Sequence, residues 1–370
     1  MLVAWLVSLV AALFSAAPSG PERAESGFDC IQPDVAASGR DVILVCGRGR
    51  SVLWSRSRDS GVTFGPLRLV ETVPGLALGM HRGPRVAMAG HAIVVAAIVQ
   101  TGRDAPGDLV AWRSADAGTT WTRSAPLNSV PMAAREGLHA LAASDDTVVV
   151  AWLDLREDGT TLRGRLSRDG GRTWESDRLL YRSPSGSICQ CCHPSLLASA
   201  DGTFAALFRN ERDGHRDMYV VESSGASGRV GRGTWAVEAC PMDGGDFVST
   251  AEGSWVSVWR RQTSIFMARG RGAEERVAEG RDPTVASGPD GTYIAWTGTD
   301  GLLLRRPGAG RTDVLDRRGS FPALAGSGRT MVAAWQRGNR AVVRPVLHET
   351  AESSGAVGVS ELPRRATLLY

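Results

Sequence analysis

The sequence predicts an all-β protein that folds as a β-propeller of seven four-stranded blades, and two kinds of repeat carry this prediction. The first is a short turn of pattern S-x-D-x-G-x-T-[W/F], which occurs at residues 57–64, 114–121 and 167–174. The pattern suits a β-hairpin turn, because the Asp carboxylate accepts hydrogen bonds from turn amides and Gly adopts a positive φ. A period of roughly 50 residues is typical of similar units arranged around an axis.

The second repeat predicts the two inner strands of each blade. An apolar segment that often starts with Pro is followed by a Gly or Asp turn and a second apolar run. Runs of this length that are split by turn residues indicate antiparallel hairpins. The expected hairpins cover residues 33–46, 84–97, 139–152, 194–208, 247–259, 283–296 and 322–335.

The three turns resemble the Asp-box, or BNR repeat, of sialidase-like β-propellers. Because sialidases have six blades, a six-bladed propeller is the alternative to seven. The resemblance implies that the Asp-boxes join the third and fourth strands of a blade and are structural turns. It does not by itself imply an activity, because one fold can carry many functions.

The ends of the chain predict export. Residues 1–24 contain an apolar run from Leu2 to Phe14, too short for the roughly 20 residues of a membrane span, followed by the small residues Ser15 and Ala17. We interpret this segment as a signal peptide, so the protein is expected to be periplasmic or extracellular, without a transmembrane helix in the mature chain. The propeller is assigned to residues 28–351, and residues 352–370 to a ring-closing strand or a tail. A net charge of +3 gives no reason to expect nucleic acid as a partner, and a monomer is expected.

Strand order predicts where a ligand would bind. Loops before each first strand and after each second strand share one face, opposite the Asp-boxes. Polar residues are frequent in these loops, and loops held by a rigid scaffold often carry function. The set includes Gln32, His81, Glu136, His139, Asp246 and Asp282. Those expected to bind a ligand are Arg82, Arg156, Arg209, Asn210, Arg216, Asp243 and Arg281.

The resemblance to sialidases implies an arginine clamp on a sugar carboxylate. We therefore expect the face to bind a carbohydrate or another anionic ligand, since guanidinium groups suit carboxylates. If a glycosidic bond is also hydrolysed, the expected catalytic residues are Asp154, Glu211 and Asp217.

A cysteine cluster supports an alternative function. The segments Cys189-Gln-Cys191-Cys192-His193 and Cys240-Pro-Met-Asp243 precede adjacent first strands. Together with the intervening Arg209–Met218 segment, they resemble a bacterial subgroup of Asp-box proteins. Disulfides are one interpretation, and Cys189–Cys192 with Cys191–Cys240 is one possible pattern.

The other interpretation of this cluster is a copper or zinc site. Its expected ligands are Cys189, Cys191, Cys192, His193 and Cys240. The alternative protein would be a non-catalytic propeller that binds metal or another protein, and no other cofactor is expected. Separately, Cys30 and Cys46 are expected to form a disulfide across the first hairpin.

Overall fold

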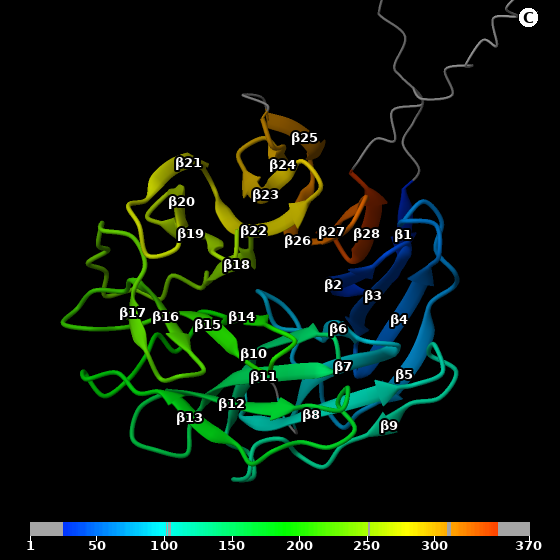
Figure 1. The fold of residues 1–370 in the computed structure, drawn as a ribbon, viewed down its shortest axis with the longest axis horizontal. Coiled ribbons are helices and arrows are strands. Elements are labelled where there is room, and N and C mark those ends of the chain that lie inside the picture. The colour runs from blue at the N-terminus through cyan, green and yellow to red at the C-terminus, as the bar shows by residue number, and fades with distance from the viewer. Residues whose placement is uncertain (1–24, 101, 103–104, 251, 309–311, 347–370) are drawn as a thin grey trace, which may run out of the picture.

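The computed structural model describes residues 25–346, except for 101, 103–104, 251 and 309–311. These residues form strands and turns and contain no helix, so the predicted all-β propeller is confirmed. The strands surround a central axis (Figure 1). Within this part of the chain there is also no helix capable of crossing a bilayer. The proposed signal peptide, 1–24, and the proposed terminal segment, 352–370, lie outside the described residues.

Each hairpin expected from the sequence forms an antiparallel pair. The pairs are β2 (Ile31–Ser38) with β3 (Asp41–Arg48), β6 (Arg85–Ala89) with β7 (Ala92–Gln100), β10 (Ala134–Ser144) with β11 (Thr147–Asp154), β14 (Ser195–Ala198) with β15 (Phe204–Arg209), β18 (Gly245–Ser249) with β19 (Trp255–Arg261), β22 (Arg281–Gly288) with β23 (Gly291–Gly298), and β26 (Gly319–Ser327) with β27 (Thr330–Arg337).

Outer strands extend these pairs away from the axis. They are β4 (Ser51–Ser57), β5 (Arg68–Thr72), β8 (Gly107–Ser114), β9 (Thr122–Arg123), β12 (Thr161–Ser167), β13 (Arg178–Tyr181), β16 (Met218–Glu222), β17 (Ser227–Arg229), β20 (Ser264–Arg269), β21 (Glu275–Glu279), β24 (Gly301–Arg305), β25 (Thr312–Asp316) and β28 (Arg340–Pro345). Each first strand contacts the first strand of the next group, and β26 contacts β2, so the first strands enclose the axis.

The number of separate blades differs from the prediction. The described residues form five separate four-stranded blades, rather than seven or six. Strands β6 to β13, expected to form two independent blades, belong to one eight-stranded sheet. The cause is a single pairing between Ala134 of β10 and Gly107 of β8, which joins the two four-stranded halves.

The last sheet is closed by the beginning of the chain. Strand β1 (Ser26–Phe28) pairs antiparallel with β28 and supplies the outermost strand of the sheet that contains β26 and β27. In Figure 1 the blue β1 lies beside the red β28. This pairing joins the two ends of the described chain in one sheet and covers the edge that β28 would otherwise expose.

The Asp-boxes are structural turns between third and fourth strands. In the first box, Gly61 N donates to Ser57 Oγ at 2.9 Å, and Thr63 N donates to Asp59 Oδ1 at 2.9 Å. Ser60 N also donates to the carbonyl of Arg40, in the turn between β2 and β3. The first Asp-box therefore lies at the end of the sheet where β2 turns into β3. The residues that precede the first strands lie at the opposite end.

Candidate functional site

The chain enters several innermost strands through an unusual backbone conformation. Gln32, His81, Asp282 and Phe321 have φ between 52° and 70°, a region that residues other than Gly seldom adopt. Three of the four immediately precede Pro, and the register of β2, β22 and β26 shifts at these positions. A bulge redirects a side chain. Non-glycine residues held in this conformation also concentrate at functional sites.

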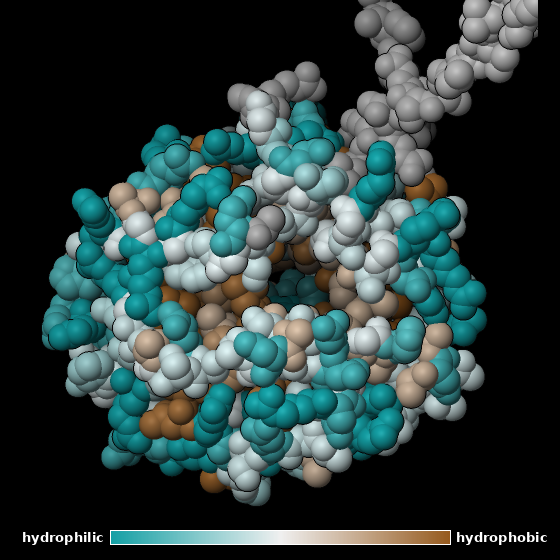
Figure 2. All heavy atoms as spheres, in the orientation of Figure 1, coloured by the Kyte–Doolittle hydropathy of each residue, from teal (hydrophilic) through white to brown (hydrophobic). Residues whose placement is uncertain are grey.

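A cavity of about 280 Å³ lies on the axis between the first strands. Its polar and aromatic lining comes from different sheets and includes Gln32, Asp34, His81, Arg85, His193, Asp246, Asp282 and Phe321. Figure 2 shows the ring hollowed at its centre, with apolar side chains on the wall and hydrophilic atoms at the base. This is the candidate functional site.

Two carboxylates and an imidazole form a connected group at the cavity, which we call the axial cluster (His81, Asp243, Asp282). His81 Nε2 lies 2.9 Å from Asp282 Oδ1, and Asp282 N donates to Asp243 Oδ2 at 2.9 Å. The ring of His193 stacks on that of His81 at a centroid distance of 4.2 Å. Gly244 N donates to His193 Nδ1 at 3.3 Å, so His193 is held from the same loop that carries Asp243.

The environment of the axial cluster changes its acid–base properties. Burial, followed by the negative charge of Asp282, raises the pKa of Asp243 to about 6. Burial, followed by the charge on His81, holds the pKa of His193 well below its ordinary value. Imidazole and carboxylate groups of this kind can bind a cation or exchange protons with a ligand.

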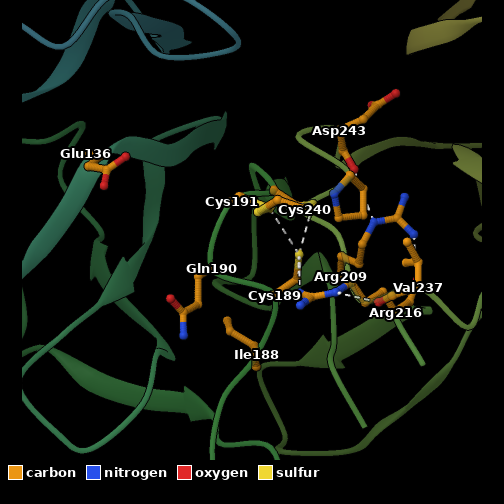
Figure 3. The surroundings of a disulfide bond; sticks show 12 residues. Glu136, Ile188, Cys189, Gln190, Cys191, Arg209, Arg216, Val237, Cys240 and Asp243 are labelled. Carbon is orange, nitrogen blue, oxygen red and sulfur yellow. Dashed lines mark hydrogen bonds between the residues drawn. A yellow bond between two sulfur atoms is a disulfide. The ribbon is translucent and has the colours of Figure 1, made fainter. Parts of the chain in front are cut away.

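The cysteine cluster lies next to the axial cluster. Cys191 and Cys240 form a disulfide (Figure 3). Cys189 and Cys192 are buried thiols with Sγ atoms 3.0 Å apart. The Cys191–Cys240 bridge is one of the two bridges in the disulfide pattern given as an interpretation of the sequence. The other half of that pattern, a Cys189–Cys192 bridge, is not formed. The predicted Cys30–Cys46 disulfide is present, with a Cα–Cα distance of 5.8 Å.

Two arginines predicted to bind a ligand instead support the cysteine cluster. Arg216 Nη1 donates to Cys189 Sγ at 3.4 Å, and its Nε donates to the carbonyl of Val237. Arg209 is 1 % exposed and donates to the carbonyls of Asp243, Arg216 and Arg260 at 2.7 to 3.1 Å. The hydrogen bond from Cys192 lowers the pKa of Cys189 to about 6, although burial opposes this, and the two guanidinium charges add to the effect.

The other predicted arginines do not converge on one point. Arg82 pairs with Glu136 at 2.7 Å. Arg156 pairs with Asp154 and Asp177. Arg281 is 59 % exposed, and its Nε lies 3.6 Å from Asp282 Oδ2. The structure therefore brings Arg209, Arg216 and Asp243 together but assembles no arginine clamp from the predicted set in the described residues.

The predicted acids occupy different surroundings. Asp154 is 0 % exposed and accepts hydrogen bonds from Arg156 and from Trp152 Nε1. Asp217 accepts from Trp235 N and Thr234 Oγ1 and pairs with Arg229 at 3.2 Å.

Glu211 and Asn210 lie beside each other at the end of β15. Glu211 is half-buried and accepts from Gly214 N. Asn210 is buried and donates to the hydroxyl of Tyr181 at 3.1 Å.

Sequence reasoning missed part of the cavity lining. Asp34, Arg85 and Phe321 were not among the expected site residues. The available signal was position, since each is directly adjacent to a proline at or near the start of a first strand. His81 and Asp282 were recognised as polar residues of this face but were not assigned to the site.

Comparison with known proteins agrees with the fold. Residues 85–232 match the family model of the BNR repeat-like domain. The resemblance to sialidase-like Asp-box propellers is thereby confirmed, whereas the subgroup defined by the cysteine segments stays a prediction. The comparison with curated proteins finds no match.

Solved structures with a similar fold include glycoside hydrolases. A Penicillium chrysogenum α-L-arabinanase, solved with arabinobiose, has 15% identity and a TM-score of 0.50, covering 75% of this chain and 92% of that one. A Hadza microbial sialidase has 15% identity and a TM-score of 0.46, covering 85% and 65%. A Dyadobacter fermentans protein of unknown function has 13% identity and a TM-score of 0.45, covering 88% and 96%. At these identities the similarity concerns the fold alone.

Proposed function

We propose that the protein binds a carbohydrate in the axial cavity, on the face opposite the Asp-boxes. The observation that carries the proposal is the cavity itself. Side chains from separate sheets converge there through strained backbone positions, and they include hydrogen-bonding groups and an aromatic ring. Ligand sites commonly combine a concave shape with a few well-placed polar groups. The glycoside hydrolases of similar fold agree with a sugar ligand.

Between the two ligand classes predicted, the geometry favours a neutral sugar over an anion. The lining contains the carboxylates of Asp34, Asp246 and Asp282 but a single arginine, Arg85. Carboxylates accept hydrogen bonds from sugar hydroxyls, whereas they repel an anionic ligand. Phe321 can supply the apolar surface on which one face of a sugar packs.

Glycoside hydrolysis is a separate proposal that rests on Asp154, Glu211 and Asp217. Hydrolysis of a glycosidic bond ordinarily uses two carboxyl groups on either side of that bond. The enclosed Asp154 favours a structural role for that residue, so Glu211 and Asp217 carry the hydrolytic proposal. A panel of chromogenic glycosides tests it, and turnover that persists in both Glu211→Gln and Asp217→Asn would contradict it.

Binding is tested by titrating the purified protein with mono- and disaccharides, including arabinobiose, in a calorimeter. We expect Phe321→Leu to weaken binding at least about tenfold, because the stacking surface is lost. Phe64→Leu is the matched control: Phe64 lies in an Asp-box at the other face, and its substitution is expected to leave binding unchanged. The proposal fails if no sugar binds, or if the two variants bind alike.

The cysteine cluster supports a second candidate, which is the copper or zinc site predicted from the sequence. Two of its five expected ligands, Cys191 and Cys240, are joined in a disulfide. His193 stacks on His81. The paired thiols of Cys189 and Cys192 remain as soft ligands. Thiol counting and metal analysis test the idea, and purified protein with two free thiols and no bound copper or zinc would contradict it.

Localisation and assembly also stay proposals. Two disulfides fit an oxidising compartment, which agrees with export directed by residues 1–24. We propose a monomeric exported protein. Cell fractionation and light scattering test these two points.

A further inference from the structure

Three potential metal ligands converge at the axial cluster. His81, Asp243 and Asp282 each present a ligand atom, and these atoms all lie within 4.8 Å of one another. They come from the loop before β6, the loop before β18 and the start of β22. The assembly of the ring is therefore what brings them together.

The cluster contains a buried carboxylate oxygen without a donor. Asp243 is 1 % exposed, and its Oδ1 has no hydrogen-bond partner among the described residues, whereas Oδ2 accepts from Asp282 N. Leaving a buried acceptor unsatisfied costs free energy, and more so when it is charged. A cation close to Oδ1 would remove this cost.

The neighbouring arginines do not form hydrogen bonds with the two carboxylates at the distances observed. Arg260 Nη1 lies 3.9 Å from Asp243 Oδ2, and Arg281 Nε lies 3.6 Å from Asp282 Oδ2. Both distances exceed a hydrogen bond, and both involve the Oδ2 atoms. Each arginine pairs with an Oδ2 atom, whereas Asp282 Oδ1 lies 2.9 Å from His81 Nε2.

The ligand side chains are held in position before any ion binds. His81 N donates to Gln32 Oε1 at 2.9 Å, and the imidazole is stacked on His193. The main chain of Asp243 is fixed by Arg209, whose Nε donates to its carbonyl at 3.1 Å. Contacts that orient metal ligands in this way contribute to affinity.

We propose that His81, Asp243 and Asp282 form a binding site for one divalent transition-metal ion of the zinc or manganese class. One imidazole and two carboxylates suit these ions better than soft copper(I). Three protein ligands leave coordination positions open toward the cavity. Binding replaces the hydrogen bond between His81 Nε2 and Asp282 Oδ1, so Nε2 carries no proton when it coordinates the ion, and any proton on Asp243 is released. None of the three ligands is a cysteine, and His81 and Asp282 also line the cavity proposed for the sugar.

The proposal is tested by calorimetric titration of the metal-stripped full chain with Mn²⁺ and Zn²⁺ in sugar-free buffer. We expect one Mn²⁺ per chain, and at least about tenfold weaker binding in both His81→Ala and Asp243→Asn. The matched control is Asp316→Asn, which removes a carboxylate that is 6 % exposed at the end of the outer strand β25, outside the axial cluster. It should bind Mn²⁺ like the unsubstituted protein. Circular dichroism verifies that each variant is folded. If Asp243→Asn does not fold, Mn²⁺ binding by His81→Ala decides the test.

A double variant separates this site from the cysteines. Cys189→Ser/Cys192→Ser is expected to retain stoichiometric Mn²⁺ binding, because Mn²⁺ disfavours thiolate ligands. The proposal is overturned if Mn²⁺ and Zn²⁺ do not bind, if His81→Ala binds as well as Asp316→Asn, or if the cysteine variant loses Mn²⁺. Because no sugar is present, failure here leaves the carbohydrate proposal standing, and the converse also holds.

Discussion

The guanidinium of Arg216 lies 3.4 Å from the sulfur of Cys189 and hydrogen-bonds to it. The same thiol is 3.0 Å from Cys192, which supplies the main effect that lowers its pKa to about 6. This shift favours the thiolate form of Cys189, and the nearby Cys191 and Cys240 are already bridged. A stabilised thiolate beside a second thiol is a reactive arrangement, and its burial restricts access to small reagents.

Arg216→Gln should raise the pKa of Cys189, because one of the two positive charges that stabilise the thiolate is removed. The ultraviolet absorbance of the thiolate, followed against pH, measures the change. Arg212→Gln is the control, since Arg212 lies in the same segment but is exposed and pairs with Asp213. Equal titration curves for the two variants would show that Arg216 does not act on the thiol.

Gly118→Ala should destabilise the fold through the second Asp-box. Gly118 has a φ of 86°, and a Cβ at this position would overlap the ring of Trp54 in the neighbouring sheet. Backbone strain and overpacking together should lower the free energy of unfolding by about 2 to 4 kcal/mol. Chemical denaturation measures this value.

Gly225→Ala measures how much free energy of unfolding is lost through backbone strain alone. Gly225 has a φ of 88°, nearly the same as Gly118, but no atom lies within 4 Å of the added Cβ. A loss of only about 1 kcal/mol is expected. If both variants lose the same free energy, the contact with Trp54 has no part in it.

Local patterns were sufficient to predict much of the fold. The hairpins were predictable because alternating apolar residues and turn residues act within about 15 residues of chain. The Cys30–Cys46 disulfide followed from the two ends of one such hairpin. The joining of β8 and β10 was not predictable, because it depends on one pairing between Ala134 and Gly107 in successive repeats.

The candidate site was harder to predict, because its chemistry depends on which side chains are already engaged. Arg209 and Arg156 have the residue type and loop position of ligand-binding arginines, yet the structure satisfies them with carbonyls and carboxylates. The axial cluster combines residues about 40 to 200 positions apart, and only ring closure brings them together. Sequence position placed these residues in loops of one face but did not reveal the hydrogen-bond partners of each residue, and ligand binding at this face stays a prediction.

His139 should make the stability depend on pH. It is completely buried, and burial lowers its pKa to about 4. The unfolded chain, with an ordinary histidine pKa near 6.5, binds a proton at a higher pH than the folded protein does. The stability is therefore fully present above about pH 6.5 and falls as the pH is lowered toward 4, by up to about 3 kcal/mol.

Denaturation at several pH values tests this contribution. His139→Gln should make the dependence between about pH 6.5 and 4 shallower, because one of the two histidines whose pKa is lowered by burial is gone. His91→Gln provides the comparison, since His91 is exposed in the turn between β6 and β7. An unchanged pH dependence in His139→Gln would contradict the assignment.

Asp154 distinguishes a structural carboxylate from a catalytic one. Its oxygens are enclosed by Arg156 at 2.7 Å and by Trp152 Nε1 at 2.8 Å, with Arg163 at 3.8 Å. Asp154→Ala leaves buried cationic and indole donors without their acceptor, so the free energy of unfolding should fall by about 3 to 5 kcal/mol. A catalytic acid on an open surface would instead lose turnover with little change in stability. Denaturation of Asp154→Ala beside the exposed control Asp158→Ala separates the two roles, and a variant as stable as the control would return Asp154 to the list of catalytic candidates.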